Sequence, residues 1–386
     1  MKKIRVLFPF VEAGFGHIMP MRSVYETFKE KYGDKVEVVA SKFYTESGNK
    51  HLIKYEQMIS KQVRIYNRNP AVGWLLSGGS NVIGSRLSTF ISMRLFSPVA
   101  CKEGIKHMRE LEPDVVFSTH WASNYYAETL EKKPLTVMYC PDATLNQLFK
   151  YHCDLSMISM PYGYQKGLRD RRLNVNNLKY VPFLIRNEAF SISRDKKALR
   201  RKLGLPEDKF TVVLAEGGYG IGKMAAICKR IVKLHIPVTV IPVCGKNEKL
   251  FNYFKTLQPT EEITFVPYMF TEKILELEAA SDLFCGKSGN ILAEATFFGN
   301  PSIVTNCSTV IEWDIADHYI NTVGSAMKEL DPEKTVEMIE KFIKDPSLLE
   351  PYRKAAREYH SHFGSEKAAD ILWEKITETF PQLANK

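Results

Sequence analysis

Long apolar runs are absent from this chain of 386 residues. No run approaches the roughly 18 to 20 residues that a helix needs to span a bilayer, so we expect no membrane-spanning helix. The first apolar block, residues 4–10, is too short for a secretory signal and is predicted to be a buried strand. The seven cysteines are odd in number and form no Cys-x-x-Cys pair. With no export signal, this pattern favours reduced thiols in a cytoplasmic protein.

Size and composition are those of a folded protein with two domains. Hydrophobic residues make up 45% of the chain and charged residues 25%, which is typical of a globular protein. Domains commonly hold roughly 100 to 200 residues, so this length predicts two of them. The polar segment 186–208 lacks a strand pattern and ends in Gly204-Leu205-Pro206. We therefore predict an N-terminal domain over residues 1–186 and a C-terminal domain over residues 187–386, with a last helix that can cross back to the first domain.

Each half of the chain alternates short apolar runs with stretches of helical spacing. In the first half we expect a helix over Met21–Lys31 and strands over Ile4–Phe10, Val36–Ala40, Val115–Thr119, Leu135–Tyr139 and Tyr180–Phe183. In the second half we expect strands over Phe210–Ala215, Val238–Cys244, Ile263–Val266, Leu283–Cys285 and Ser302–Thr305. The second set is almost continuously apolar, as in parallel strands that are buried on both faces. The pattern predicts the α/β class, with two Rossmann-like domains facing each other across a cleft and ligands at the carboxyl ends of strands.

The first candidate site follows the first strand. The run Glu12-Ala13-Gly14-Phe15-Gly16-His17 contains two glycines that let the backbone approach a ligand closely. The helix after it offers N–H groups and the positive end of its dipole to an anion. The imidazole of His17, with an ordinary pKa of about 6.5, could take a proton from a hydroxyl group. Structural capping is the alternative explanation for this histidine.

A second candidate site follows the first strand of the second half. Residues 216–220, Glu-Gly-Gly-Tyr-Gly, form a glycine-rich turn of the kind that binds phosphate through backbone amides. The run does not match Gly-x-Gly-x-x-Gly, so it does not support a dinucleotide fingerprint. A plain tight turn is the alternative.

A third candidate site is the block Lys287–Ala295. Ser288 and Asn290 are predicted to cap a helix, and Gly289 permits close approach of a ligand. A diphosphate at this helix start would also meet Lys287. Glu294, about one turn inside the helix, could accept the two hydroxyl groups of a ribose.

Positive charge is concentrated in one segment. The chain has a net charge of +9, and residues 50–109 hold ten Lys or Arg against two acids, together with large apolar side chains such as Phe90 and Leu95. Cationic and apolar side chains in one segment suit an anionic bilayer surface. The residues predicted to bind it are Arg64, Arg68, Trp74, Leu75, Leu76, Arg86 and Arg94. A solvated basic face is the alternative; no nucleic-acid partner is expected, because no helix-turn-helix, zinc or RNA-binding signature is present.

Seven segments, in order along nearly the whole chain, carry a resemblance to a known family. They are Gly14–His17, Pro113–Val116, Tyr139–Asp142, Val181–Arg186, Val243–Asn247, Phe265–Met269 and Lys287–Pro301. The sequence resembles the inverting glycosyltransferases that include bacterial diacylglycerol glucosyltransferases, plant monogalactosyldiacylglycerol synthases and the N-acetylglucosaminyltransferase of lipid II synthesis. Cys244–Asn247 and Lys287–Pro301 are the most specific segments.

This resemblance implies a glycosyltransferase-B fold, with the acceptor on the N-terminal domain and a UDP-sugar on the C-terminal one. It implies a catalytic base, His17 or alternatively Asp142, and no metal or other cofactor. The donor-binding residues that it implies are Gly14, Gly16, Gly218, Gly220, Asn247, Pro267, Tyr268, Met269, Lys287, Ser288, Gly289, Asn290, Glu294 and Glu312. In this family, positions like Pro267–Met269 lie against uracil, one like Glu294 holds the ribose and one like Glu312 meets the sugar hydroxyls.

The expected reaction is a single inverting displacement that moves a hexose from UDP to a lipid, in the first place diacylglycerol, at the inner face of the cell membrane. Two departures from the family pattern leave the acceptor and the sugar open: Gly-Phe-Gly-His replaces the usual Gly-Gly-His or Gly-Asn-Gly-His, and Ile311-Glu312 replaces Gln-Gln or Gln-Glu. The alternatives are a polyprenyl-linked or soluble acceptor, a UDP-sugar epimerase and a non-catalytic nucleotide-sugar sensor.

Overall fold

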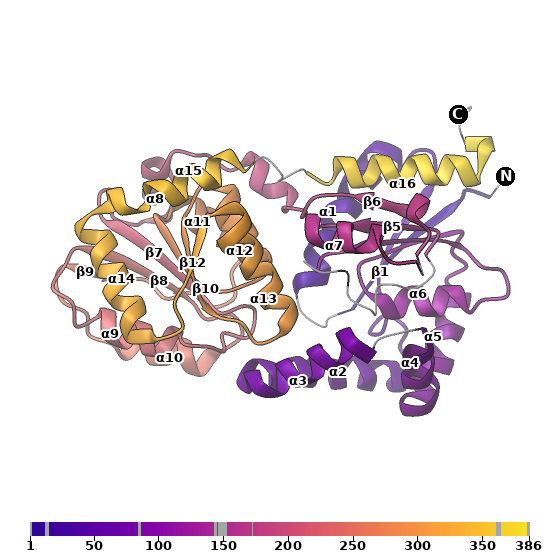
Figure 1. Ribbon diagram of the computed structural model, residues 1–386, viewed down its shortest axis with the longest axis horizontal. Helices are drawn as coiled ribbons and strands as arrows, with labels where there is room; N and C mark the ends of the chain where they lie inside the picture. The colour runs from indigo at the N-terminus through magenta and orange to yellow at the C-terminus, as the bar shows by residue number, and fades with distance from the viewer. Residues whose placement is uncertain are drawn as a thin grey trace. The chain divides into compact units, whose positions relative to one another are not determined.

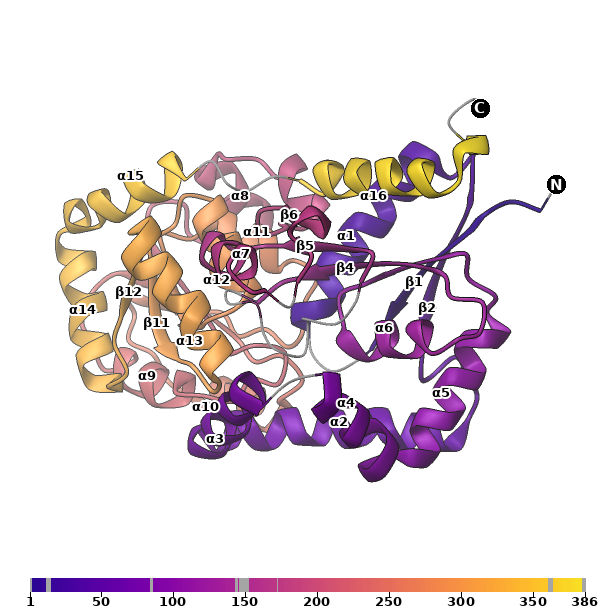
Figure 2. The ribbon, with the colours of Figure 1, turned by 45° about the vertical axis from the view of Figure 1, so that its right-hand side comes forward.

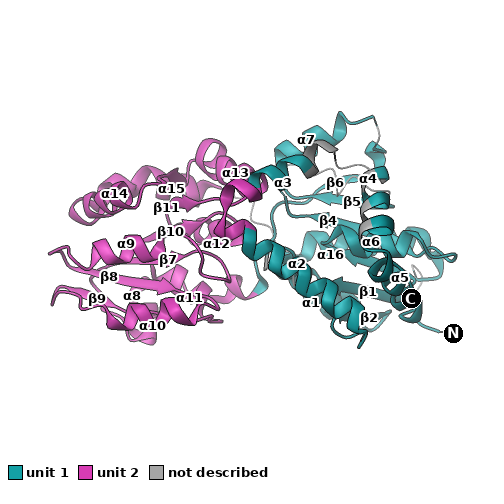
Figure 3. Cartoon of the chain, turned by 90° about the horizontal axis from the view of Figure 1, so that it is seen from below, with its two compact units in different colours: residues 1–65, 74–187, 361–386 teal, residues 66–73, 188–360 magenta. Residues whose placement is uncertain are grey.

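The computed structural model divides into two compact units, each built on one parallel sheet. Unit 1 comprises Met1–Ile65, Trp74–Asn187 and Ser361–Lys386, and unit 2 comprises Tyr66–Gly73 and Glu188–His360 (Figure 3). The structure describes residues 2–11, 15–83, 86–142, 145, 153–171, 173–359 and 364–383. The main division falls after Asn187, one residue beyond the boundary predicted from the sequence, and the C-terminal residues from Ser361 on group with unit 1.

The sheet of unit 1 has six parallel strands in the order β2-β1-β3-β4-β5-β6. They are β1 (Arg5–Phe10), β2 (Glu37–Lys42), β3 (Val115–Ser118), β4 (Leu135–Cys140), β5 (Leu155–Ile158) and β6 (Leu178–Tyr180). The α-helices of the first half and the last helix are α1 (Phe15–Tyr32), α2 (Lys50–Arg68), α3 (Pro70–Ile83), α4 (Arg86–Ile91), α5 (Pro98–Glu110), α6 (Trp121–Glu128), α7 (Pro161–Leu168) and α16 (Glu366–Thr379). The strand order reverses at β1, which pairs with β2 on one side and β3 on the other.

Successive residues of β1 enter two different cores, because side chains alternate across a strand. Val6 and Phe8 pack with α1 and α16, whereas Leu7 packs on the opposite face with α5 and α6. Figure 2 shows α16 lying beside α1, where the rings of Tyr32 and Trp373 stack with centroids 4.5 Å apart. Burial on both faces explains why the strand is apolar along its whole length.

The sheet of unit 2 also has six parallel strands, in the order β12-β11-β10-β7-β8-β9. They are β7 (Phe210–Ala215), β8 (Val238–Val243), β9 (Ile263–Phe265), β10 (Leu283–Lys287), β11 (Ser302–Asn306) and β12 (Ala326–Lys328). The α-helices are α8 (Lys196–Leu203), α9 (Met224–Ile231), α10 (Glu248–Thr256), α11 (Ile274–Ala280), α12 (Asn290–Phe297), α13 (Val310–Asp317), α14 (Pro332–Lys344) and α15 (Glu350–Glu358), as labelled in Figure 1. The order reverses between β7 and β10, the position at which sheets of this kind bind ligands.

Short helical turns of the 3-10 or π type complete the described secondary structure. They lie at Ser92–Phe96, Val175–Asn177, Asn187–Ser191, His318–Val323, Pro346–Leu349 and Pro381–Leu383.

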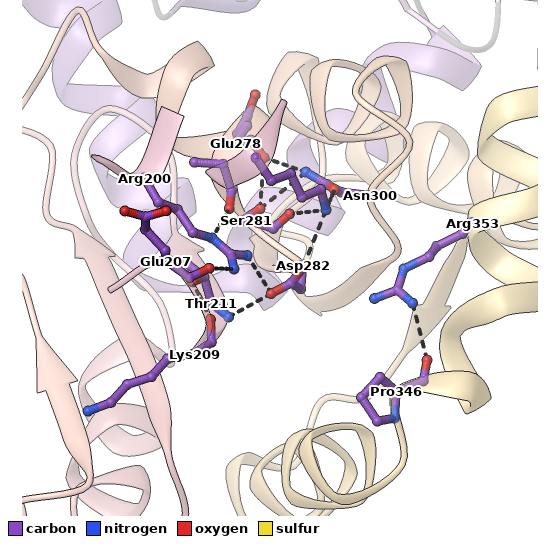
Figure 4. A network of polar contacts seen from close by, with 12 residues as sticks. Arg200, Glu207, Lys209, Thr211, Glu278, Ser281, Asp282, Asn300, Pro346 and Arg353 are labelled. Carbon is purple, nitrogen blue, oxygen red and sulfur yellow. Dashed lines mark hydrogen bonds and ion pairs between the residues drawn. The ribbon is translucent and has the colours of Figure 1, made fainter. Parts of the chain in front are cut away.

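The amino ends of the unit 2 strands are closed by a polar network (Figure 4). The Asp282 carboxylate accepts from Nη2 of Arg200 at 2.6 Å and from the backbone N–H of Thr211 at 2.9 Å. Lys196 lies in the same network, with Nζ 3.4 Å from Asp282 and 3.0 Å from Oδ1 of Asn300. These groups satisfy one another at the amino ends of the strands, and the glycine-rich loops lie at the other end of the sheet.

The α/β class and the parallel sheets confirm the predicted class, while one strand and one helix differ in their bounds and two strands were missed. Of the expected strand Tyr180–Phe183, only Tyr180 is in a strand, because β6 ends at that residue. Pro182 has no N–H to donate to a neighbouring strand. The expected helix at Met21 begins earlier, at Phe15, with Pro20 inside it. Strands β5 and β12 were missed because Ser156 interrupts the first and Lys328 ends the second, so neither is a continuous apolar run.

Candidate functional site

The candidate base lies where the strand order of unit 1 reverses. His17 is in the first turn of α1, directly after β1, and its ring nitrogen Nδ1 lies 2.8 Å from the backbone carbonyl of Thr119, which follows β3. A carbonyl oxygen only accepts, so Nδ1–H donates and the lone pair of the neutral ring is on Nε2. The hydroxyl of Thr119 donates back to the His17 carbonyl at 2.6 Å. Two reciprocal bonds therefore set the position and the tautomer of the imidazole.

Burial lowers the pKa of His17 below its usual value of 6.5, and the bond to the Thr119 carbonyl opposes that change. The ring is consequently neutral near pH 7, the form in which an imidazole accepts a proton. The role of His17 as base stays a prediction, and the contact with Thr119 identifies Nε2 as the ring nitrogen that carries the lone pair.

His120 is a neighbour that the sequence analysis missed. Its ring meets that of His17 edge to face, with centroids 5.6 Å apart. The N–H of Ala122 donates to Nδ1 of His120 at 3.3 Å, so this side chain caps α6. Burial, and secondarily the nearby charge of His17, lowers the pKa of His120 to about 3. The available signal was position: His120 directly follows a run predicted to be a strand, and ligands meet strand ends.

The other unit 1 candidates lie at or near the same edge of the sheet. Asp142 follows β4 and is buried, and its backbone carbonyl accepts from the hydroxyl of Ser159 at 3.3 Å. Gly16 is exposed in the first turn of α1, and a Cβ atom there would meet nothing within 4 Å. Gly14 lies outside the described residues.

In unit 2, the glycine turn after β7 is fitted against the loop after β8. Gly220 has φ +56°, and a Cβ atom there would lie 2.1 Å from the carbonyl oxygen of Cys244. The side-chain amide of Asn247 donates to the Gly220 carbonyl at 3.1 Å, and its oxygen caps α10. Lys246 N–H donates to the carbonyl of Gly218 at 2.9 Å. Close approach and positive φ together explain why glycine is required here.

The block at the end of β10 begins with an ion pair. Nζ of Lys287 lies 2.7 Å from Oε1 of Glu312, in the first turn of α13, and both side chains are largely buried. Oε2 of Glu312 accepts from the Ser308 N–H at 2.6 Å. Gly217, after β7, would place a Cβ atom 3.8 Å from Cδ of Lys287. Loops after β7, β10 and β11 therefore meet around Lys287, at the reversal point of this sheet.

The predicted caps of α12 are wrong. The N-cap is Gly289, with φ +140° and ψ −155°, and it makes no side-chain cap bond. Ser288 is still attached to the sheet through its N–H, which donates to Asn306 at 3.3 Å, and Asn290 is already the first helical residue. The start of α12 therefore has no side-chain cap, and the positive end of the helix dipole there favours an anion.

The remaining donor candidates flank this helix start. Glu294 is buried in the second turn of α12. Pro267, Tyr268 and Met269 are half-buried in the loop after β9. The N–H of Tyr268 donates to Pro242 at 2.9 Å, and its carbonyl accepts from Cys244 at 2.8 Å, so this loop continues the β8 ladder.

The basic segment forms α2 to α5 and carries an exposed apolar surface. Arg64, Arg68 and Arg94 are exposed; the Arg86 side chain lies outside the described set. Trp74, Leu75 and Leu76 are 42%, 76% and 49% exposed. Seven other large apolar residues of this segment are also exposed: Met58, Ile65, Leu87, Phe90, Ile91, Leu95 and Val99. Within the described residues, no helix is both long enough and apolar enough to cross a membrane.

Comparison with known proteins supports the resemblance seen in the sequence. No family model matches the chain. It is similar to a probable chloroplastic monogalactosyldiacylglycerol synthase of Nicotiana tabacum, with 24% identity over 322 residues that cover 78% of this chain and 58% of the relative. It is similar to a processive diacylglycerol beta-glucosyltransferase of Bacillus pumilus, with 23% identity over 97% of this chain and 95% of the relative. This chain thus spans little more than half of the plant relative.

Solved structures match over almost the whole chain. Acinetobacter baumannii MurG has a TM-score of 0.59 at 12% identity and covers 96% of this chain and 99% of its own. Staphylococcus aureus MnaA, solved with UDP, has a TM-score of 0.62 at 15% identity and covers 99% and 97%. These likenesses confirm the glycosyltransferase-B fold, and the relatives confirm the predicted resemblance.

Proposed function

We propose that this protein is an inverting glycosyltransferase that transfers a hexose from a UDP-sugar to diacylglycerol and so forms a glycolipid. The observation that carries the proposal is the similarity to the Bacillus pumilus processive diacylglycerol beta-glucosyltransferase, because it extends over 97% of this chain and 95% of that enzyme. The arrangement of polar groups in both units is consistent with such chemistry.

The proposal assigns the donor to unit 2. The glycine turn at Gly218 and Gly220 and the start of α12 would bind the diphosphate together with Lys287. The Gly220 N–H itself already donates to the Gly217 carbonyl at 3.0 Å. By the family resemblance, Glu294 would bind the ribose, Pro267–Met269 would lie against the uracil and Glu312 would bind the sugar hydroxyls. Since Glu312 already neutralises Lys287 at 2.7 Å, the diphosphate would compete with a carboxylate for the lysine charge.

The proposal assigns the acceptor and the base to unit 1. The acceptor oxygen forms a bond to the anomeric carbon, the bond from that carbon to the diphosphate breaks, and UDP leaves with the bonding electrons. The hydroxyl proton passes to Nε2 of His17, the nitrogen that carries the lone pair in the tautomer set by Thr119. Asp142 is the alternative base. No cofactor is required by this scheme, because the substrates carry every group that moves.

One assay tests the reaction. Each of UDP-glucose, UDP-galactose and UDP-N-acetylglucosamine, labelled in the sugar, is offered with diacylglycerol, with a polyprenyl diphosphate or with a soluble glycoside. We expect label in a diacylglycerol product whose anomeric configuration is opposite to that of the donor. Label only in a polyprenyl or soluble product would refute the acceptor, and retained configuration would refute the single displacement.

A UDP-sugar epimerase is the second candidate, because a putative UDP-N-acetylglucosamine 2-epimerase of Listeria monocytogenes matches the fold with a TM-score of 0.61 at 12% identity. Incubation of each UDP-sugar without acceptor separates the two functions. An epimerised sugar nucleotide would support the epimerase, and unchanged UDP-sugar supports the transferase.

We further propose that the surface formed by α2 to α5 docks on anionic lipid at the inner face of the cell membrane. Exposed arginines provide attraction that salt screens over about 8 Å at physiological ionic strength. The exposed apolar side chains, including Trp74 and Leu75, would insert into the bilayer, and this part of the binding would not be weakened by salt.

The docking surface is tested by sedimentation with vesicles of phosphatidylglycerol and phosphatidylcholine. Replacing Arg64, Arg68, Arg86 and Arg94 by Gln should weaken vesicle binding at least about tenfold, because each charge near an anionic surface contributes about 1 kcal/mol. UDP affinity and activity on a detergent-dispersed short-chain acceptor should stay unchanged. The matched control replaces four exposed lysines of unit 2 by Gln, namely Lys255, Lys273, Lys334 and Lys341. Equal loss of vesicle binding in both variants would refute a specific docking surface, because binding would then depend only on the net charge of the protein.

A further inference from the structure

A buried carboxylate lies directly behind the glycine turn of unit 2. Glu216 follows β7 and is only 2% exposed. Its Oε1 accepts from the backbone N–H of Lys223 at 3.1 Å and from the hydroxyl of Thr305 in β11 at 3.0 Å. The first bond closes a ring from residue 216 to residue 223, immediately before α9. The second ties that ring to another strand of the sheet.

The backbone of the turn is packed against this carboxylate. A Cβ atom on Gly222 would lie 2.2 Å from Oε2 and 2.3 Å from Cδ of Glu216, and all three atoms nearest to it belong to the carboxyl group. Gly222 does not have a positive φ, unlike Gly217 and Gly220. Glycine at position 222 is therefore explained by contact with Glu216 and not by backbone conformation.

Burial of the Glu216 carboxyl group costs free energy of folding in these surroundings. Oε2 of Glu216 has no hydrogen-bond partner among the described residues. The titratable groups that interact with Glu216 are Lys287 of β10 and the buried thiols of Cys228 and Cys285. Burial raises the pKa of Glu216, while its bonds to Lys223 and Thr305, the nearby Asn306 side chain and the charge of Lys287 oppose that change. A half-satisfied carboxyl group in a core destabilises the fold, so a compensating role at the turn is expected.

We propose that Glu216 is a positioning residue, whose carboxyl group holds the backbone of residues 217–222 in the conformation that binds the donor diphosphate. The inference rests on the proposed function, since it assumes a diphosphate at this turn. Glu216 itself does not touch the donor: it acts from behind, through the Lys223 bond and the contact with Gly222.

Two substitutions and their combination test the contact. Gly222→Ala introduces a methyl group that displaces the carboxylate, and Glu216→Ala removes it; each should raise the UDP Kd at least about tenfold, a factor that corresponds to about 1.4 kcal/mol. In the double variant the methyl group occupies the space that the carboxylate vacates. We expect its UDP Kd to lie within about threefold of the Kd of Glu216→Ala alone. The increase in Kd would then be far smaller than the product of the two single increases, because the effects of substitutions at residues in contact are not additive.

Two control variants distinguish a positioning role of Glu216 from a general loss of folded structure. Glu216→Gln keeps the oxygen that accepts from Lys223 and Thr305, and it should bind UDP within about threefold of the parent. Gly79→Ala is the matched glycine control: Gly79 lies in α3, and a Cβ atom there meets nothing within 4 Å. This variant should bind UDP as the parent does.

Amide hydrogen exchange provides a readout that needs no donor. The peptide that covers residues 217–223 should exchange at least about tenfold faster in Glu216→Ala and Gly222→Ala than in the parent and in Glu216→Gln. If the parent binds UDP and Glu216→Ala binds it equally well, the positioning role is refuted and the glycosyltransferase proposal is unaffected. If the parent binds no UDP, the donor site proposed for unit 2 fails, and unchanged exchange in Glu216→Ala would refute the positioning role independently.

Discussion

His120 should make unit 1 less stable in mild acid. Its folded-state pKa of about 3 lies below the ordinary value of 6.5, so the unfolded chain binds the proton first as the pH falls. Stability attributed to this residue is therefore complete above pH 6.5 and is lost progressively between pH 6.5 and pH 3. At pH 5.0, one and a half pH units below 6.5, the loss is about 2 kcal/mol, since each unit contributes about 1.4 kcal/mol.

The perturbation is His120→Gln, which removes the titrating ring. We expect this variant to be less stable than the parent at pH 7.5, because the cap on the Ala122 N–H is altered, but to lose about 2 kcal/mol less between pH 7.5 and pH 5.0. The other histidines are present in both proteins, so the difference between the two pH dependences reports the loss of the His120 ring together with its contact with His17.

Urea unfolding followed by tryptophan fluorescence measures this difference. A Trp313→Phe background leaves Trp74, Trp121 and Trp373, which all belong to unit 1, and Trp121 stacks on His120 with centroids 5.5 Å apart. His51→Gln, at an exposed histidine, is the control substitution. The reasoning is refuted if His120→Gln loses as much stability on acidification as the parent does.

Three further outcomes are expected at the candidate site. His17→Ala should lower kcat by about 10² to 10⁴ while calorimetry shows unchanged UDP affinity; near-normal turnover would transfer the role of base to Asp142. Glu294→Ala should weaken UDP binding by about 1 to 3 kcal/mol through loss of charge-assisted hydrogen bonds, and unchanged affinity in the folded variant would remove Glu294 from the site. Glu312→Gln should tighten binding of UDP itself, because the Lys287 charge is no longer neutralised at 2.7 Å. Lys287→Met should weaken UDP binding. If Glu312→Gln weakens UDP binding and Lys287→Met tightens it, the ion pair serves structure alone.

The two-unit architecture was predictable because it is encoded locally. A strand buried on both faces must be apolar at nearly every position, as Val212 to Ala215 are, and such a run is visible without knowledge of its neighbours. The same logic failed for Leu155–Ile158 and Ala326–Lys328. Ser156 interrupts the first run and Lys328 ends the second, so these strands are recognised only by their pairing with β4 and β11.

The candidate site was predictable only as separate pieces. Gly-Phe-Gly-His after one strand and Lys-Ser-Gly-Asn after another are local signals, since turns of this kind need glycine and strand ends meet ligands. The role of Gly222 was not accessible in this way, because its requirement for glycine comes from a carboxylate six residues away that folds back beneath it.

The sequence by itself determined which residues can form parallel strands, where the glycine turns fall and which side chains could accept a proton or face an anion, because each of these depends on spacing along the chain. The tertiary structure decided which pieces meet. β1 lies beside β3, although more than a hundred residues separate them, and this pairing alone brings the Thr119 carbonyl to Nδ1 of His17 and the ring of His120 to its edge. The tautomer of the proposed base and the pKa of its neighbour thus follow from strand order and burial, which are properties of the folded sheet and of no segment alone.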